Sequence, residues 1–368
     1  MPILALAYEL KQLQPGCQII YVGERQGGFV RLTANSPAID DHYAISAGKF
    51  RRYHGESLLR RLTDLKTIAL NLRDMGRVLR GISQAWRLLG KLDPDVVFLK
   101  GGFVGVPVGV AAALRRMPIV THDSDATAGL ANRLVSRWTR LHATALSAEY
   151  YPYPPAKVQT VGVLVEPSFQ AVTASAQAGF KRQLNLPEQA PVLLITGGSL
   201  GAQRLNQAVA GIAAPLLEAH PSLHIIHQVG QGKAGVYGDY RHDRLQVLEF
   251  LAPMAAYTGA ADVVVARASA NTLAELGVQG KACIAVPSPY LSGGHQLKNA
   301  QRLAEQGAAV VIAEAMLHDP QQGLLPVITE LLASQSRREQ LGRVLQSQTI
   351  PDAAHRLAVL LLAQATTP

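Results

Sequence analysis

Glycines, a serine and backbone amides that could bind a diphosphate follow an apolar run in the second half of the chain. The segment 197–202 reads GGSLGA and comes directly after the apolar residues 192–195. Glycines let the backbone approach a phosphate closely, and the first N–H groups of a helix donate to it with the help of the helix dipole. The pattern predicts a strand, a phosphate-binding turn and a helix. A tight packing turn is the alternative interpretation.

Two more groups of polar residues follow apolar runs downstream. The segment 267–275, RASANTLAE, follows the run 261–266. Glu275 would lie on the second turn of a helix that begins near Ser269, where a carboxylate can accept hydrogen bonds from both hydroxyls of a ribose. An exposed glutamate on a capped surface helix is the alternative. The segment 287–300, PSPYLSGGHQLKNA, follows the run 282–286. Because α/β proteins bind ligands at the carboxyl ends of parallel strands, we expect one shared site.

The composition fits a two-domain α/β protein. The 368 residues exceed the usual size of a single core, and 48% hydrophobic with 17% charged residues is ordinary globular usage. Cys17 and Cys283 lie in different halves beside apolar runs, which favours buried thiols over a disulfide and suits a reducing compartment. The longest apolar run, 104–114, is shorter than the ~20 residues that span a bilayer. We therefore expect the chain not to cross a membrane.

Positive charge is concentrated between residues 49 and 91. This segment holds eleven Lys or Arg residues against three acidic ones, a net charge of +8 compared with +9 for the whole chain. Apolar residues recur beside the arginines at helical spacing, as in a basic amphipathic helix. They are Ile68, Leu72, Met75, Leu79, Ile82 and Trp86. A core-facing stripe is an equal alternative. Nucleic acid is not an expected partner, because no nucleic-acid motif accompanies the charge and only 5% of residues are aromatic.

The three polar segments, in this order, resemble the glycosyltransferase family 28 enzymes that add N-acetylglucosamine to lipid I to make lipid II. That family carries GGSQGA at the first segment, R-S/A-G-A-x-T-x-x-E at the second, and QQ or HQ before x-x-N-A at the third. The segments 227–230, HQVG, and 250–254, FLAPM, also match family motifs. Leu200 replaces the usual glutamine, which leaves the backbone donors in place. Ser269 replaces the usual glycine, and we expect it to narrow the approach to the helix start.

The first half resembles the same family. The segment 92–107 matches its strand and glycine pair, and 118–132 matches its H-E-x-N-x-x-x-G-x-x-N motif. Asp123 stands for the family glutamate. Asp125 stands for an amide, so that an acceptor-only carboxylate replaces a group that can also donate. Where the family has GNPVR, this chain reads GVLVE, and Glu166 offers no cation for the donor contact that the resemblance would assign to the arginine.

The start of the chain departs most from the family. Residues 1–10 read as the first helix of a Rossmann-like half, and Pro2 matches the last proline of the family segment GGTGGHxxP. That segment follows a strand and carries a histidine often proposed as general base. We expect a truncated or mis-started reading frame over a naturally shortened member, because a parallel sheet rarely tolerates the loss of an early central strand. The catalytic candidates that remain are His122 and Asp123.

The resemblance implies an α/β fold of the glycosyltransferase B type, with two Rossmann-like domains facing each other across a cleft. Residues 1–165, with the first strand missing, would bind lipid I, and residues 166–345 would bind UDP-N-acetylglucosamine. A C-terminal helix within 346–368 would cross back to the first domain. The enzyme would act as a peripheral protein on the cytoplasmic side of the plasma membrane, at an anionic membrane surface, with other cell-wall synthesis proteins as further partners.

The resemblance also assigns the donor site. Backbone amides and Ser199 would bind the diphosphate, Glu275 the ribose, Leu251 and Met254 the uracil, and His295 with Gln296 the sugar. The assigned donor residues are Gly198, Ser199, Gly201, Leu251, Met254, Ala270, Asn271, Thr272, Leu273, Glu275, His295 and Gln296.

We expect no metal at the donor site, because enzymes of this fold stabilise the leaving diphosphate with amides and helix dipoles. The segment 123–125 has the spacing of an Asp-x-Asp metal motif but lies in the acceptor half. Alternative functions are a noncatalytic nucleotide-sugar-binding subunit, another UDP-sugar transferase, or a nucleotide-sugar epimerase. A nicotinamide dehydrogenase is the weakest alternative, because the GxGxxG spacing is absent.

Overall fold

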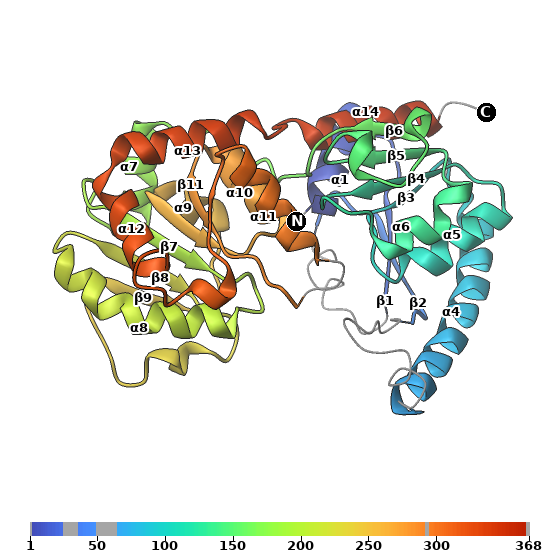
Figure 1. Cartoon of the computed structure of the whole chain (residues 1–368). Helices are drawn as coiled ribbons and strands as arrows, with labels where there is room; N and C mark the ends of the chain where they lie inside the picture. The colour runs from blue at the N-terminus through green and yellow to red at the C-terminus, as the bar shows by residue number, and fades with distance from the viewer. Residues whose placement is uncertain (1, 25–35, 49–64, 291–293, 366–368) are drawn as a thin grey trace. The chain divides into compact units, whose positions relative to one another are not determined.

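The computed structural model describes residues 2–24, 36–48, 65–290 and 294–365 (Figure 1). The chain divides into two compact units. Met1–Glu166 and Asp352–Pro368 form the first, and Pro167–Pro351 forms the second. The domain limits predicted from the sequence, 165/166 and 345/346, lie close to these divisions. Each unit is built around parallel strands, as the buried apolar runs predict.

The first unit contains two parallel sheets. One pairs β1 with β2, and the other has the order β3-β4-β5-β6. The strands are β1 (Ile20–Glu24), β2 (Asp41–Ile45), β3 (Val97–Leu99), β4 (Ile119–Asp123), β5 (Leu141–Thr144) and β6 (Val158–Thr160). That the first sheet lacks a strand stays a prediction.

Helices pack on these sheets and on each other. They are α1 (Pro2–Leu13), α4 (Leu65–Leu92), α5 (Gly105–Leu114), α6 (Leu130–Val135) and α14 (Ala353–Ala365), with the 3₁₀ turns η1 (Ser136–Trp138), η2 (Ala148–Tyr150) and η3 (Pro155–Lys157). The C-terminal helix α14 belongs to the first unit and packs on α1. Between them, Nδ1 of His355 lies 3.1 Å from the Glu9 carboxylate.

Helix α4 exposes four residues of its predicted apolar stripe, and a fifth, Ile82, is half-buried. Its buried residues are Asp74, Val78, Gly81, Ala85 and Leu89, and the exposed ones include Leu72, Met75, Leu79 and Trp86. The core-facing alternative is therefore wrong for these four apolar side chains, of which Leu72 is 69% exposed. The basic residues between 49 and 64, and the side chains of Lys66 and Ile68, lie outside the described residues.

The second unit contains one parallel sheet with the order β12-β11-β10-β7-β8-β9. Its strands are β7 (Val192–Thr196), β8 (His224–Gln228), β9 (Leu245–Leu248), β10 (Val263–Ala266), β11 (Ala282–Ala285) and β12 (Val310–Val311). Its helices are α7 (Ala174–Gln183), α8 (Gln203–Ala219), α9 (Met254–Ala260), α10 (Ala270–Gln279), α11 (His295–Glu305), α12 (Leu324–Ala333) and α13 (Gln335–Ser347), with the turns η4 (Ala234–Tyr237) and η6 (Glu314–Met316).

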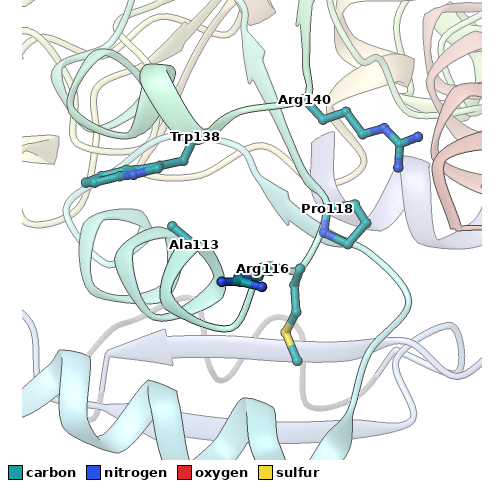
Figure 2. A pocket seen from close by; sticks show the side chains of 6 residues that line it. Ala113, Arg116, Pro118, Trp138 and Arg140 are labelled. Carbon is teal, nitrogen blue, oxygen red and sulfur yellow. The ribbon is translucent and has the colours of Figure 1, made fainter. Parts of the chain in front are cut away.

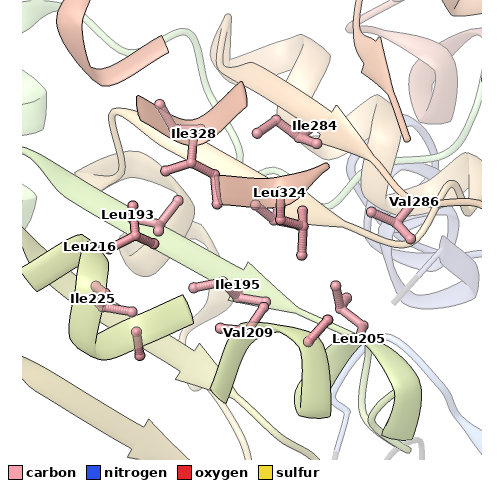
Figure 3. Packing of buried hydrophobic residues seen from close by; sticks show 14 of the residues in the cluster. Leu193, Ile195, Leu205, Val209, Leu216, Ile225, Ile284, Val286, Leu324 and Ile328 are labelled. Atoms are coloured by element: carbon pink, nitrogen blue, oxygen red, sulfur yellow. The ribbon is translucent and has the colours of Figure 1, made fainter. Parts of the chain in front are cut away.

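Strand β7 buries both of its faces, because successive side chains alternate between the two sides of a strand. Leu193 and Ile195 pack against α8 and α12, as Figure 3 shows, whereas Val192 and Leu194 belong to a second cluster with residues of α10. Core residues therefore pack on both sides of the strand that leads into the glycine turn. Cys283 is buried in β11 as expected, but Cys17 is only half-buried, and both are free thiols.

None of the helices within the described ranges is long and apolar enough to span a bilayer.

Candidate functional site

Three loops that follow strands of the second sheet bring the predicted donor residues to one edge. Strand β10 pairs in parallel with β7 on one side and with β11 on the other, so the loops after them leave the same edge of the sheet. These loops carry the segments 197–202, 267–275 and 287–300. The prediction that the three segments follow neighbouring parallel strands and share one edge of the sheet is therefore confirmed.

The glycine turn after β7 is held by its own backbone. Gly198 and Gly201 have φ of 80° and 66°, and a Cβ on Gly201 would lie 1.9 Å from the carbonyl oxygen of Val229. The Gly198 amide donates to Oγ1 of Thr196 at 3.1 Å, and the Gly201 amide donates to the Gly198 carbonyl at 2.9 Å. These two predicted phosphate donors thus already have partners. Ser199 is exposed on the turn.

Leu200 and Lys233 are two side chains at the glycine turn, one pointing to solvent and one supporting the turn. Leu200 is 84% exposed, so the change from the family glutamine leaves the backbone of the turn undisturbed. Lys233 donates from Nζ to the carbonyl of Leu200 at 2.7 Å and thereby supports the turn from the loop after β8. Sequence reasoning missed Lys233, since nothing in the local pattern joins it to a segment about thirty residues away.

Ser269 and Glu275 occupy the start and the second turn of α10. Ser269 is the N-cap, and its Oγ accepts a hydrogen bond from the Thr272 amide at 3.3 Å. The Leu273 amide donates to the Ser269 carbonyl at 3.0 Å, and the Leu273 side chain is buried in the core. Ala270 and Asn271 are therefore the better-placed amide donors for a ligand.

Burial dominates the electrostatics at Glu275. It raises the pKa of the Glu275 carboxyl to about 7. An exposed glutamate, the alternative interpretation, does not fit this residue. Close by on the same helix, Oδ1 of Asn271 is buried and has no hydrogen-bond partner among the described residues. A ligand hydroxyl or amide could supply that partner.

The loop after β11 leads into α11 and is tied back to the sheet. Gln296 is buried, and its Oε1 accepts a hydrogen bond from the Ser288 amide at 2.9 Å. Asn299 donates from Nδ2 to the carbonyl of Ala268 at 3.2 Å, which joins α11 to the loop before α10. His295 begins the helix and is half-buried. Gln296 would therefore meet a sugar through its amide nitrogen.

The predicted uracil residues follow β9. Leu251 is buried in the same core cluster as Leu273, and Met254, the first residue of α9, packs against that cluster. The Gln279 side chain of α10 donates to the carbonyl of Ala255 at 2.9 Å. The structure thus brings Leu251 and Met254 close to the helix that carries Glu275.

Four charged or polar side chains link the loops of this edge, and no role was predicted for any of them from the sequence. Arg267 donates to the Glu314 carboxylate at 2.5 Å, and Arg204 lies 3.6 Å from the other oxygen of that carboxylate. Arg204 also donates to the hydroxyl of Tyr290 at 2.5 Å. Glu314 could not be found from sequence, because it follows the short edge strand β12 with no motif around it.

In the first unit, His122 and Asp123 are the last two residues of strand β4. His122 is completely buried, and its Nε2 is 2.9 Å from the Gly162 carbonyl, so Nε2 carries the proton. Burial, aided by Lys100, holds the pKa of His122 well below its usual value, so the ring is neutral. Asp123 accepts hydrogen bonds from the Gly129 amide at 2.8 Å and the Tyr153 hydroxyl at 2.7 Å. Burial raises the pKa of the Asp123 carboxyl.

Lys100, at the end of β3, is a charged neighbour that the sequence did not single out. Its Nζ donates to Oγ of Ser124 at 2.5 Å. Burial lowers the pKa of Lys100 to about 8, against the opposing effects of Asp125 and Asp123. The acceptor-only carboxylate of Asp125 thus has a cation nearby. In the described part of the chain, no three His, Cys, Asp or Glu side chains gather as metal ligands.

Comparison with known families and proteins identifies the family of the chain. The glycosyltransferase family 28 N-terminal domain matches residues 1–143, and the family's C-terminal domain matches residues 192–357. The UDP-N-acetylglucosamine–N-acetylmuramyl-(pentapeptide) pyrophosphoryl-undecaprenol N-acetylglucosamine transferase of Salinibacter ruber is 34% identical over 99% of this chain and 93% of its own length. The transferase of the same name from Desulforudis audaxviator is 32% identical over 97% of this chain and 95% of its own.

Solved structures agree as well. Acinetobacter baumannii MurG superimposes with a TM-score of 0.70 at 25% identity, over 98% of this chain and 95% of that one. The UDP-GlcNAc 2-epimerase of Neisseria meningitidis gives a TM-score of 0.65 at 11% identity, over 98% and 96%, and shares the fold alone. Because an epimerase shares this fold, the class is set by the family models and the relatives, which identify a UDP-N-acetylglucosamine-dependent glycosyltransferase. The chain belongs to glycosyltransferase family 28, and the resemblance seen in its motifs is confirmed.

Proposed function

We propose that the protein transfers N-acetylglucosamine from UDP-N-acetylglucosamine to the C4 hydroxyl of N-acetylmuramic acid in undecaprenyl-pyrophosphoryl-MurNAc-pentapeptide. This step converts lipid I to lipid II in peptidoglycan synthesis. The observation that carries the proposal is the shared carboxyl edge, where the glycine turn after β7 adjoins the α10 start and Glu275 after β10. Relatives that bear the name of this transferase cover nearly the whole chain, which disfavours a noncatalytic binding subunit.

The donor would lie along this edge. Ser199, the amides of the glycine turn other than those of Gly198 and Gly201, and the amides of Ala270 and Asn271 would bind the diphosphate. Glu275 would accept hydrogen bonds from the ribose hydroxyls. Leu251 and Met254 would contact the uracil, and His295 with Gln296 the sugar. We expect this binding to need no metal, because oriented N–H groups and a helix dipole can stabilise the charge of the leaving diphosphate.

The reaction would invert the sugar carbon. The acceptor O4 attacks C1 from the face opposite to UDP, the bond from C1 to the β-phosphate oxygen breaks, and the hydroxyl proton passes to a base. We assign the base to Asp123 over His122, because both ring nitrogens of His122 are buried and Nε2 already donates to the Gly162 carbonyl. A raised pKa brings the Asp123 carboxyl closer to the working pH, which suits a base. His122 would serve to hold β4 in place through its hydrogen bond to the Gly162 carbonyl.

The outward stripe of α4 is suited to a membrane surface on which a polyprenyl-linked substrate lies. Arg73, Arg77, Arg80 and Arg87 are exposed beside Leu72, Met75, Leu79 and Trp86. The stripe continues onto α5, because Arg115 donates to the Trp86 carbonyl at 2.6 Å and stacks 4.2 Å above the Trp86 ring.

A shallow pocket of about 290 Å³ lies next to this end of α5 (Figure 2). It is lined by Ala113, Arg116, Met117, Pro118, Trp138 and Arg140. Its arginines and exposed Trp138 extend the basic and apolar surface. We propose reversible attachment through this surface to anionic lipid on the cytoplasmic face of the membrane.

A transfer assay tests the proposed function. With labelled UDP-N-acetylglucosamine and a lipid I analogue, the label should move to the lipid, and it should do so in chelator as well as in magnesium. Strict dependence on magnesium would contradict metal-free binding of the donor, whereas no transfer under any condition would contradict the function itself.

A further inference from the structure

Arg204, Arg267, Tyr290 and Glu314 lie in the loops or first turns that follow four strands adjacent in the sheet. Arg204 is in the first turn of α8 after β7, Arg267 follows β10, Tyr290 follows β11, and Glu314 follows β12. Because these strands have the order β12-β11-β10-β7 and are parallel, all four side chains start from the carboxyl edge that carries the donor segments.

Contacts join the four side chains into one cluster. The Glu314 side chain is only 3% exposed and lies between two guanidinium groups, 2.5 Å from Arg267 and 3.6 Å from Arg204. Arg267 also donates to the Val286 carbonyl at 3.3 Å. Arg204 packs over the Tyr290 ring, 4.7 Å from its centre, and donates to its hydroxyl. Arg267 therefore bonds directly to Glu314 and to the backbone, whereas Arg204 lies farther from the Glu314 carboxylate.

The charges of this cluster do not cancel. Two guanidinium groups face a single carboxylate, so one formal positive charge remains within the cluster. It resides on Arg204, whose side chain is 60% exposed and whose contact with Glu314 is longer than a hydrogen bond. The first turn of α8 follows the glycine turn directly, so the backbone of Arg204 lies next to the turn proposed to bind the diphosphate. A planar guanidinium is well suited to two phosphate oxygens.

We infer that Arg204 binds the diphosphate of the nucleotide sugar and that Glu314 and Tyr290 are positioning residues that hold it over the edge. This inference rests on the proposed function, since it places the diphosphate of UDP at the glycine turn. Arg204 would balance the negative charge that grows on UDP as the bond to the sugar breaks. Arg204 would thereby place a full positive charge beside the diphosphate, where the helix dipole offers only a partial one.

Calorimetry with two probes, UDP and uridine, tests the inference on the full chain. Arg204→Gln should weaken UDP binding about tenfold to a hundredfold, the usual effect of losing a hydrogen bond to a charged group, and leave uridine binding within about twofold. Arg204→Lys, which keeps the charge but not the planar fork, should lose less. Tyr290→Phe should weaken UDP binding by a smaller factor and also spare uridine. Added salt should narrow the gap between wild type and Arg204→Gln.

Arg182→Gln is the matched control, because Arg182 lies in the same unit, is also 60% exposed and also forms an ion pair, with Glu188. It should leave the affinity for both probes unchanged. Equal UDP affinity of wild type and Arg204→Gln, with wild type binding UDP, would overturn the inference alone. Equal losses for UDP and uridine would overturn it too, by showing a general disturbance of the unit. Failure of the wild-type protein to bind UDP at all would overturn the proposed function along with the inference.

Discussion

The hydroxyl of Ser269 accepts a hydrogen bond from the backbone amide of Thr272 and so caps the first turn of α10. The Ser269 hydroxyl also donates a hydrogen bond to Oγ1 of Thr272 at 2.9 Å. Ser269 has a φ of −76°, a conformation open to any residue, so this position does not require the glycine that the family carries. The cap satisfies one of the helix amides that would otherwise lack a partner.

Replacing Ser269 tests whether it serves as a cap or narrows the approach to the helix. Ser269→Ala should lower the free energy of unfolding by about 1 kcal/mol, and Ser269→Gly by only a few tenths, because glycine is tolerated at N-caps. Urea denaturation measures both. The UDP affinity of Ser269→Gly should equal that of the wild type, whereas a clear gain would show that the serine does restrict access.

Uridine binding should depend on the ionisation of Glu275. Its carboxyl has a pKa raised to about 7, so it is mostly neutral at pH 6 and mostly ionised at pH 8. Only the ionised form accepts from both ribose hydroxyls. Affinity should therefore rise between these pH values. Uridine is the suitable probe because it has no phosphate that titrates in this range.

Two variants separate the ribose contact from other effects. Glu275→Ala should weaken uridine binding by roughly 1 to 3 kcal/mol, the cost of hydroxyls left unpaired in a closed site. Glu275→Gln should bind weakly and equally at both pH values. If Glu275→Ala binds uridine as well as the wild type does, Glu275 does not contact the ribose.

The exposed stripe of α4 should drive attachment to anionic vesicles. A triple change of Arg73, Arg77 and Arg80 to Gln should reduce partitioning by about 3 kcal/mol at low salt, at roughly 1 kcal/mol per basic residue. Co-sedimentation with phosphatidylglycerol vesicles measures it. Binding of the wild type should also fall as salt rises, because exposed charges are screened over about 8 Å at physiological ionic strength.

The matched control changes Arg337 and Arg343 of α13, which are exposed arginines of the second unit. That variant should partition like the wild type. Changing Leu72 and Leu79 to Ser should weaken binding even at high salt, since it removes apolar side chains. Equal binding of the wild type to neutral and anionic vesicles would contradict the proposal that the basic residues of α4 attract the protein to anionic lipid.

Asp123 should be required for transfer but not for donor binding. Asp123→Asn should lower kcat by about 10² to 10⁴, the usual effect of losing a general base, while UDP affinity in calorimetry stays unchanged. Tyr153→Phe removes a hydrogen bond that lowers the pKa of Asp123, so the acid limb of the kcat/KM profile should move to higher pH. An unchanged kcat in Asp123→Asn would assign the base to another group.

Local patterns were enough to predict the edge of the second sheet. Apolar runs gave β7, β10 and β11, because strands buried on both faces need continuous apolar residues. Ser269 marked the start of α10, and the glycine turn marked that of α8. These signals lie within a few residues of the features they predict. The family resemblance rested on the same segments.

Features that depend on tertiary packing were not predictable. The pair between Arg267 and Glu314 joins residues that are 47 positions apart and meets only because β12 lies at the sheet edge. Helical periodicity placed Leu72 and Leu79 on one face of α4 but could not tell solvent from core, since either environment suits the spacing. The complete burial of His122 likewise follows from its place in β4 and not from its motif.

The mass and anomeric configuration of the product formed from UDP-N-acetylglucosamine and a lipid I analogue give the most direct test of the proposed transfer. We expect an acceptor heavier by one N-acetylhexosamine, joined through a β linkage to C4 of N-acetylmuramic acid, with one UDP released for each acceptor changed. UDP release with an unchanged acceptor, an α-linked product, or conversion of the donor to its 2-epimer would contradict it.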